Sequence, residues 1–188
     1  LVLENKFKSY NKVFPLQTIK EDKIRIAYIG AFRYETIIKY LIEVCSANIE
    51  KLDLRFYGDG PNRIIEEIKN STISNANIYY YGAFKNPDDL GSVYSENNVN
   101  FAAYDNTLEN EQVAMPNKFY ESGFFNIPIV CSENTFVGEK VKELNMGWVI
   151  NPTKEGIETF FNNLTLDNVL NCHNNIKKLN KSKFEFEN

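Results

Sequence analysis

The hydrophobic positions of the chain form short apolar runs that alternate with stretches of helical spacing. The runs are rich in β-branched and aromatic residues and end near turn residues, as strands do. They predict six strands, at Ile24–Gly30, Leu52–Tyr57, Asn77–Tyr81, Val99–Tyr104, Ile127–Cys131 and Gly147–Ile150. Helical spacing predicts helices at residues 35–48, 61–68, 87–94, 116–125, 136–145, 153–163 and 166–180.

This order predicts an α/β fold, a Rossmann-like doubly wound parallel sheet of about six strands. Short apolar strands alternating with helices are typical of a parallel sheet covered on both faces, and right-handed crossovers favour the doubly wound form. Residues 1–22, broken by Pro15, are interpreted as a linker, and residues 23–188 as one domain with two C-terminal helices. Because such sheets bind ligands beyond the carboxyl ends of their strands, we expect the site in those loops.

Charge and composition narrow the range of functions. The chain has 188 residues, enough for one core, with a formal net charge of −4 and a pI near 5.2. Nucleic-acid binding would need a basic stripe, and none is visible. The three widely spaced cysteines are interpreted as buried thiols in a reducing cytosol. His173 is the only histidine, which argues against a zinc site or histidine-based catalysis.

The sequence contains no run that resembles a membrane helix and no signal peptide. The chain starts at Leu1 rather than at a methionine. We therefore expect a cytoplasmic protein whose natural chain begins upstream of this residue.

Two loops that follow strands contain glycine. The Gly-Asp-Gly-Pro turn at residues 58–61 lacks the third glycine of a dinucleotide fingerprint and follows the second strand, so a tight turn is favoured over phosphate contact. Gly30 follows the first strand, and Arg33 lies just beyond it. The arginine is interpreted either as a bidentate hydrogen-bond donor to phosphate oxygens or as a solvated residue at a strand end.

The helix predicted after Met115 contains the main candidate site. Pro116 opens this helix, so its first backbone N–H groups are expected to face the cleft and bind an anion. Lys118 adds positive charge to the first turn, and Glu121 follows one turn later on the same face. These groups suit a nucleotide, with diphosphate on the N–H groups and ribose hydroxyls on the carboxylate. An intrahelical Lys118–Glu121 ion pair without further role is the alternative.

Several motifs follow one another in a fixed order. They are the Gly-Asp-Gly-Pro turn, a strand ending in glycine, an Asp-Leu…Tyr helix, a Pro-Asn-Lys-x-x-Glu helix and a strand with proline, at residues 58–61, 77–82, 89–94, 116–121 and 127–130. Over about residues 24–150 this order resembles the C-terminal, nucleotide-sugar-binding domain of GT-B glycosyltransferases. The likeness is greatest to their bacterial family 4-like group.

The resemblance implies roles for individual residues. Glu121 matches the glutamate that holds the ribose hydroxyls, and Arg33 is similar in place to a basic residue at the diphosphate. The loop Ala83–Phe84 corresponds to the lining of the nucleobase. The helix start at Asn117–Lys118 corresponds to the phosphate site.

Two positions depart from the family pattern. Many members carry a second glutamate eight residues before the ribose glutamate, at the donor sugar, and here that position is Val113. Glu109 or Glu111, from the same loop, could replace it. Asn126 stands where the family has glycine before its proline-containing strand, so we expect a left-handed turn residue there.

The resemblance also implies an activity for the whole protein. It would transfer a sugar from a nucleoside diphosphate-sugar, most simply a UDP-sugar, to a hydroxyl acceptor in polysaccharide or glycan synthesis. No Asp-x-Asp metal motif is present, so metal-independent catalysis is expected. The expected partner is an N-terminal acceptor domain absent from this chain, which alone should bind nucleotide weakly and catalyse little. A lipid-linked acceptor at the inner face of the membrane is a further expected partner.

Two other classes remain open from the sequence. A nucleotide-sugar epimerase or a phosphorylase would share the two-domain plan. A non-catalytic nucleotide-binding or regulatory domain would keep the fold and lose the sugar site, a reading that Val113 favours modestly.

Overall fold

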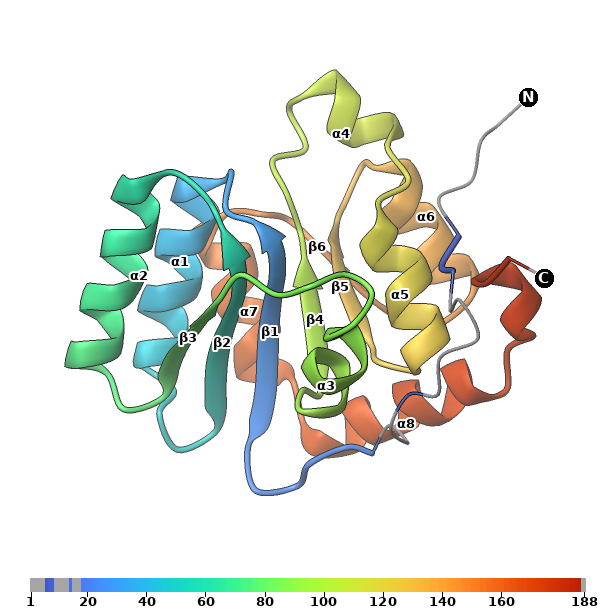
Figure 1. Ribbon diagram of the computed structural model, residues 1–188, viewed down its shortest axis with the longest axis horizontal. Helices are drawn as coiled ribbons and strands as arrows, with labels where there is room; N and C mark the ends of the chain where they lie inside the picture. The colour runs from blue at the N-terminus through green and yellow to red at the C-terminus, as the bar shows by residue number, and fades with distance from the viewer. Residues whose placement is uncertain (1–5, 9–13, 15–17, 187–188) are drawn as a thin grey trace.

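The computed structural model describes residues 6–8, 14 and 18–186 and contains a central sheet of six parallel strands. The strands are β1 Ile24–Ala31, β2 Leu52–Asp59, β3 Ile78–Gly82, β4 Val99–Ala102, β5 Ile129–Ser132 and β6 Gly147–Ile150. Their order in the sheet is β3-β2-β1-β4-β5-β6, which confirms the predicted doubly wound fold (Figure 1). The order reverses between β1 and β4, so their carboxyl ends flank the expected crevice.

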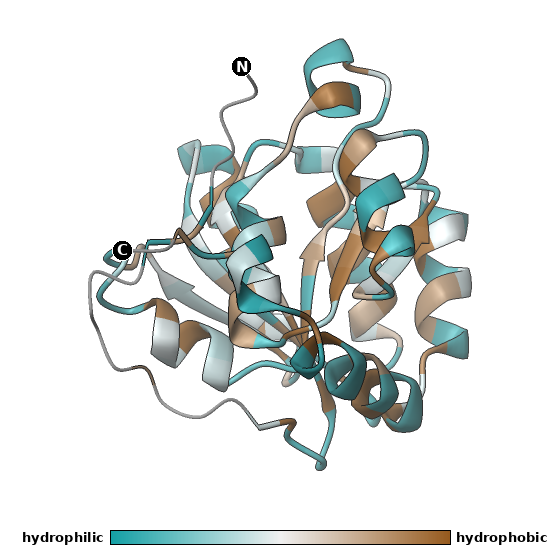
Figure 2. Ribbon diagram, turned by 90° about the vertical axis from the view of Figure 1, so that its right-hand side faces the viewer, coloured by the Kyte–Doolittle hydropathy of each residue, from teal (hydrophilic) through white to brown (hydrophobic). Residues whose placement is uncertain are grey.

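Helices cover both faces of this sheet. They are α1 Glu35–Ser46, α2 Asn62–Ser74, α3 Leu90–Ser95, α4 Glu109–Val113, α5 Asn117–Phe125, α6 Phe136–Glu143, α7 Lys154–Asn163 and α8 Leu166–Lys177, followed by the 3₁₀ turn η1 Lys181–Lys183. Helices α1, α2 and α7 share one buried cluster with inward side chains such as Ile26 and Phe56. Helices α5 and α6 pack on the opposite face around Ile129, and α3 packs there around Ile29. Figure 2 shows apolar residues both on strands and on parts of the helices, alternating with hydrophilic stretches.

One predicted helix begins later than expected, and one helix was missed. Helix α3 begins at Leu90 rather than at residue 87, so Asp88 and Asp89 precede it instead of lying in its first turn. The carboxylate of Asp89 instead accepts the Lys85 N–H at 2.7 Å, and the Asp89 N–H donates to the Lys85 carbonyl at 2.8 Å, which closes a turn. Helix α4 was not predicted, because its sequence Glu-Asn-Glu-Gln-Val has no apolar spacing to follow.

The Gly-Asp-Gly-Pro segment forms the tight turn predicted for it. Gly58 has a φ of +147°, and a Cβ at this position would lie only 1.8 Å from the Gly30 carbonyl oxygen. The Gly60 N–H donates to the Asp59 carboxylate at 2.8 Å. The turn therefore packs directly on the end of β1, where a side chain has no room.

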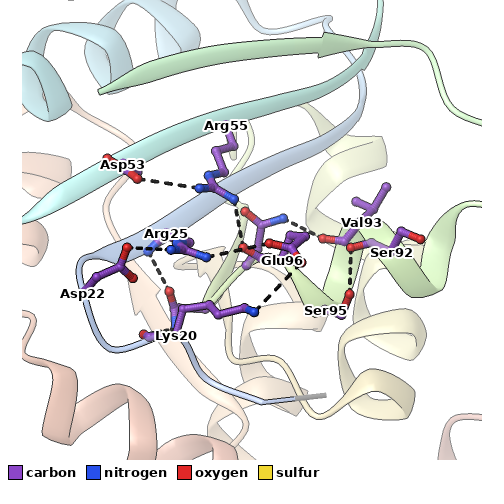
Figure 3. Close-up of polar contacts among 11 residues, drawn as sticks. Lys20, Asp22, Arg25, Asp53, Arg55, Ser92, Val93, Ser95 and Glu96 are labelled. Atoms are coloured by element: carbon purple, nitrogen blue, oxygen red, sulfur yellow. Dashed lines mark hydrogen bonds and ion pairs between the residues drawn. The ribbon is translucent and has the colours of Figure 1, made fainter. Parts of the chain in front are cut away.

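Charged side chains close the amino edge of the sheet (Figure 3). Arg25 on β1 pairs with Asp22 at 2.6 Å and with Glu96 at 3.7 Å. Arg55 on β2 donates to the Glu96 carbonyl at 3.0 Å and lies 3.7 Å from Asp53. The network ties the segment before β1 and the end of α3 to the first two strands.

The carboxyl end of α5 is held by the last part of the chain. Asn126 ends the helix with a φ of +61°, which confirms the left-handed turn residue. Its carbonyl accepts a hydrogen bond from His173 Nδ1 at 2.6 Å, and Lys181 Nζ donates to the Gly123 carbonyl at 2.7 Å. The Phe184 ring packs so closely on Gly123 that a Cβ there would lie 2.2 Å from a ring carbon.

The expected linker over residues 1–22 falls largely outside the described residues. Within it, Phe7 is buried and forms a parallel β-bridge with Glu185. The Phe7 N–H donates to the Phe184 carbonyl at 2.7 Å. The two ends of the described chain therefore lie side by side, next to α5.

The cysteines are buried thiols, as predicted. Cys45, Cys131 and Cys172 form no disulfide, and burial raises the pKa of the Cys172 thiol to about 12. A separate finding is that no helix in the described part of the chain is long and apolar enough to cross a membrane.

We expect the free energy of unfolding to depend on pH because of the buried His173 imidazole. Burial lowers the pKa of its imidazole below the ordinary value of 6.5. Between the folded pKa and 6.5 the unfolded chain binds more protons than the folded chain, so the free energy of unfolding should fall as the pH drops through this window. Urea unfolding between pH 7.5 and 5 should show this loss in the wild type and a smaller one in His173→Gln. An NMR titration with a His173 pKa at or above 6.5 would contradict the prediction.

Candidate functional site

Helix α5 starts at the carboxyl edge of the sheet, beside the end of β1. Pro116 precedes it with extended dihedrals, and no side chain caps the helix start at Asn117. A Cβ added at Gly30 would lie 3.4 Å from Cε of Lys118. The structure therefore brings the first-strand glycine, the helix start and the lysine together, as the sequence predicted.

Glu121 lies one turn further along α5 and is almost completely buried. Its side chain is 3% exposed and that of Lys118 is 12% exposed. One carboxylate oxygen, Oε2, accepts hydrogen bonds from Lys118 Nζ at 2.6 Å and from the Tyr94 hydroxyl at 2.9 Å. The intrahelical ion pair weighed as the alternative is thus present, but in a buried site, where removing one partner leaves a charge uncompensated.

A polar network that the sequence did not reveal supports Glu121 from behind. Asn100 on β4 donates to the Ser122 hydroxyl at 2.9 Å and to the Tyr94 hydroxyl at 3.3 Å. Tyr94 stacks on Phe125, with ring centroids 4.8 Å apart. Burial and the nearby charge of Glu121 raise the pKa of Tyr94, so its hydroxyl remains a donor. The one available signal was an asparagine inside an otherwise apolar strand.

The loop that contains Ala83–Phe84 runs from β3 in front of β2 and β1 toward α3 (Figure 1). Ala83 is exposed, whereas Phe84 is half-buried against the cluster that includes Tyr94 and Leu90. The loop therefore comes close to the residues behind Glu121.

The remaining sequence candidates are more exposed than Glu121. Arg33 and Asn117 are exposed. Val113, at the position of the family's second glutamate, is 73% exposed on α4. Of the two possible replacements, Glu109 is exposed, whereas Glu111 is half-buried and accepts a hydrogen bond from the Tyr34 hydroxyl.

The arrangement suits a ligand that is both anionic and rich in hydroxyl groups. An uncapped helix start carries partial positive charge, and Lys118, paired with Glu121, lies in its first turn. Arg33 follows by three residues the Gly30 that lies next to Lys118. Glu121 adds a fixed carboxylate that accepts hydrogen bonds. A nucleoside diphosphate has both of the required parts.

A comparison with known families identifies the family of the chain. The family model of glycosyl transferases group 1 matches residues 10–179. The chain belongs to this family. None of the curated proteins compared matches the chain.

Solved structures with this fold include members of the same family. The C-terminal domain of a group 1 glycosyl transferase, LpcC, from Francisella tularensis has 12% identity and a TM-score of 0.68, covering 92% of this chain and 97% of that one. Anabaena HepE, solved with UDP-glucose, has 12% identity and a TM-score of 0.69, covering 87% and 45%. A putative UDP-N-acetylglucosamine 2-epimerase from Listeria monocytogenes has 12% identity and a TM-score of 0.59, covering 85% and 40%.

These identities establish the fold alone. Because an epimerase shares the fold, it is the family match that favours glycosyl transfer over the epimerase alternative. The chain spans less than half the length of HepE and of the Listeria protein, and nearly all of the isolated LpcC domain. The chain is therefore similar to the C-terminal domain of the group 1 glycosyl transferases.

Proposed function

We propose that the chain is the donor-binding half of a glycosyltransferase that uses a nucleoside diphosphate-sugar. The observation that carries this proposal is the meeting of Lys118, Glu121 and Gly30 at an uncapped helix start beside the switch point. The proposed nucleotide is UDP, a choice supported by the UDP-glucose bound to HepE, which has the same fold. The proposed acceptor is a hydroxyl group of a polysaccharide or another glycan.

In the proposed complex the diphosphate lies on the N–H groups at Asn117–Lys118 and against Arg33, while the ribose hydroxyls donate to Glu121. In the structure Lys118 pairs with Glu121. In the proposed complex the lysine side chain would turn from this carboxylate to the diphosphate. The ribose hydroxyls then take its place on the carboxylate. The nucleobase would lie along the Ala83–Phe84 loop.

The proposed reaction breaks the bond between the anomeric carbon and the diphosphate oxygen. A new bond forms from that carbon to the acceptor oxygen, whose proton is lost to a base. The nucleoside diphosphate leaves with one additional negative charge. Arg33, Lys118 and the helix start would stabilise this charge by fixed electrostatics, without a metal ion.

The rest of the proposed enzyme lies outside this chain. An N-terminal domain would bind the acceptor, for which we propose a lipid-linked or polysaccharide substrate on the cytoplasmic side of the membrane. The chain alone would then bind the donor weakly and catalyse little.

Calorimetric titration with UDP, GDP and ADP tests the nucleotide site. We expect UDP to bind. Lys118→Met should lower the affinity for UDP about tenfold, because a charge-assisted hydrogen bond to phosphate is lost. Lys140→Met is the matched control. Lys140 also pairs with the glutamate three residues on at 2.6 Å, but on the surface and far along the sequence from the site.

Two outcomes would overturn the assignment. One is the absence of binding by all three nucleotides at millimolar concentration. The other is an equal effect of the two lysine substitutions, which would show that Lys118 acts only through the net charge of the chain.

A further inference from the structure

A polar groove of about 750 Å³ opens next to the proposed nucleotide site, on the α1 side of the switch point. Its walls come from three loops that follow strands: the start of α1 after β1, residues 105–111 after β4, and residues 151–153 after β6. This volume is in the range of small-ligand sites. All three loops belong to the carboxyl edge, so the groove opens to the same side as the helix start of α5.

The groove adjoins the proposed phosphate site at two points. Arg33 forms part of its wall and follows Gly30 by three residues. Glu111 lines the groove and also a small cavity that reaches Pro116, directly before α5. A group attached to a diphosphate at the start of α5 would therefore be placed at the mouth of this groove.

The wall at Glu111 is held in a fixed geometry. The Tyr34 hydroxyl donates to Glu111, and the Tyr34 ring stacks on Tyr104 with centroids 4.9 Å apart and planes at 21°. Burial, followed by the hydrogen bond to Glu111, raises the pKa of Tyr34, which keeps its hydroxyl protonated. The carboxylate thus retains acceptor capacity on one side of the groove while its position is fixed from the other.

A buried hydroxyl without a partner lies behind the same wall. Tyr28 is 1% exposed, and its hydroxyl makes no hydrogen bond within the described residues. The ionisable groups that act on it are Tyr34, Glu111 and Arg33, all of which line the groove. Tyr28 is not itself a lining residue, so its hydroxyl belongs to the buried side chains behind this wall rather than to the surface of the groove.

The charges of the groove select the kind of occupant. Glu35 is balanced by Lys39 at 2.9 Å and by Arg63. Asp105 accepts from the Thr107 N–H and hydroxyl, which lowers the pKa of its carboxyl and keeps it ionised. Among the described residues that line the groove, Arg33 is the only cation, and the proposed diphosphate uses it. Asp105 and Glu111 then face the occupant without a counter-charge.

We propose that this groove holds the glycosyl group of the donor and that Asp105 and Glu111 restrict it to sugars without a negative charge, which excludes uronic acids. The inference rests on the proposed nucleotide site and adds the class of sugar to it. Carboxylates, amides and tyrosines suit the hydroxyl groups of a neutral sugar, whereas an additional carboxylate would meet two like charges.

Titration with UDP, UDP-glucose and UDP-glucuronate tests the proposal, because glucuronate differs from glucose only in having a carboxylate in place of the hydroxymethyl group. UDP-glucose should bind more tightly than UDP, and UDP-glucuronate should bind about tenfold more weakly than UDP-glucose. Glu111→Gln keeps an acceptor for Tyr34 but removes the charge. It should leave UDP affinity unchanged and reduce the discrimination between the two sugars. Glu109→Gln, on the exposed side of α4, should change neither.

The outcomes separate the two proposals. If UDP does not bind, the proposed function fails, and the inference about the groove fails with it. If UDP binds but the sugars do not differ in affinity, or if Glu111→Gln leaves their difference unchanged, the groove does not select the sugar and only this inference is overturned.

Discussion

Replacing Gly58 with alanine is expected to lower the free energy of unfolding by about 3 kcal/mol, because the new Cβ clashes with backbone and the φ angle is strained. The Cβ would lie 1.8 Å from the Gly30 carbonyl oxygen, and Gly58 has a φ of +147°. Since the obstacle is backbone, no side-chain rotation can relieve it. Urea denaturation followed by circular dichroism measures the effect.

Gly82→Ala is the matched control for this prediction. Gly82 also has a positive φ, +77°, but a Cβ there would come no closer than 3.9 Å to the nearest of its neighbours. The Gly82→Ala substitution should lower the free energy of unfolding by only about 1–2 kcal/mol, which is the strain of a left-handed residue. Equal losses in the two variants would show that the turn does not press on the end of β1.

Replacing Glu121 with alanine should have the largest effect on function, a loss of about 10- to 100-fold in UDP affinity. The ribose hydroxyls would lose a charged acceptor, and hydrogen bonds to charged groups contribute about 1.5–3 kcal/mol. The chain should also lose stability, because the buried Tyr94 hydroxyl and the Lys118 ammonium lose their partner. Calorimetry and urea denaturation on the same samples separate the two effects.

Two further variants identify the cause of the lost affinity. Glu121→Gln keeps an acceptor for Tyr94, so it should unfold at a higher urea concentration than Glu121→Ala. It should still bind UDP weakly. Tyr94→Phe leaves the carboxylate in place and should reduce affinity only a few-fold. Wild-type affinity in Glu121→Ala would show that the buried pair serves the fold alone.

The strands could be predicted from the sequence because each is a local apolar run. In a parallel sheet covered on both faces, nearly every strand side chain is buried, so a run such as Val99–Ala102 is visible without knowledge of its neighbours. Helix α4 escaped prediction because its five residues have none buried. Short polar helices of this kind depend on their tertiary contacts, and the local spacing of residues does not reveal these contacts.

The same distinction applies to the site. Lys118 and Glu121 could be paired from the sequence because they are three residues apart on one helix. The contacts of Tyr94 with Glu121 and of Tyr34 with Glu111 join residues 27 and 77 positions apart. Such contacts depend on the crossing of the chain between β3 and α3 and on the position of α4. Neither could be derived from one sequence.

The buried Lys118–Glu121 pair also bears on the proposed nucleotide site. A carboxylate that is 3% exposed would be costly without a counter-charge. The lysine supplies this charge in the free protein. In the proposed complex, the affinity for a nucleotide would then be the difference between the contacts that Glu121 makes with the ribose and those it now makes with Lys118.

The charged network at the amino edge of the sheet has a consequence for protein engineering. Arg25, Arg55 and Glu96 join strands and connecting segments at the edge opposite to the proposed site. Loops at the carboxyl edge could therefore be exchanged with those of other group 1 glycosyl transferases without disturbing these contacts. Residues 105–113 are the natural segment for such a graft, because α4 has no buried residue. The donor preference of such a chimaera would test whether residues 105–113 select the sugar, as the inference about the groove proposes.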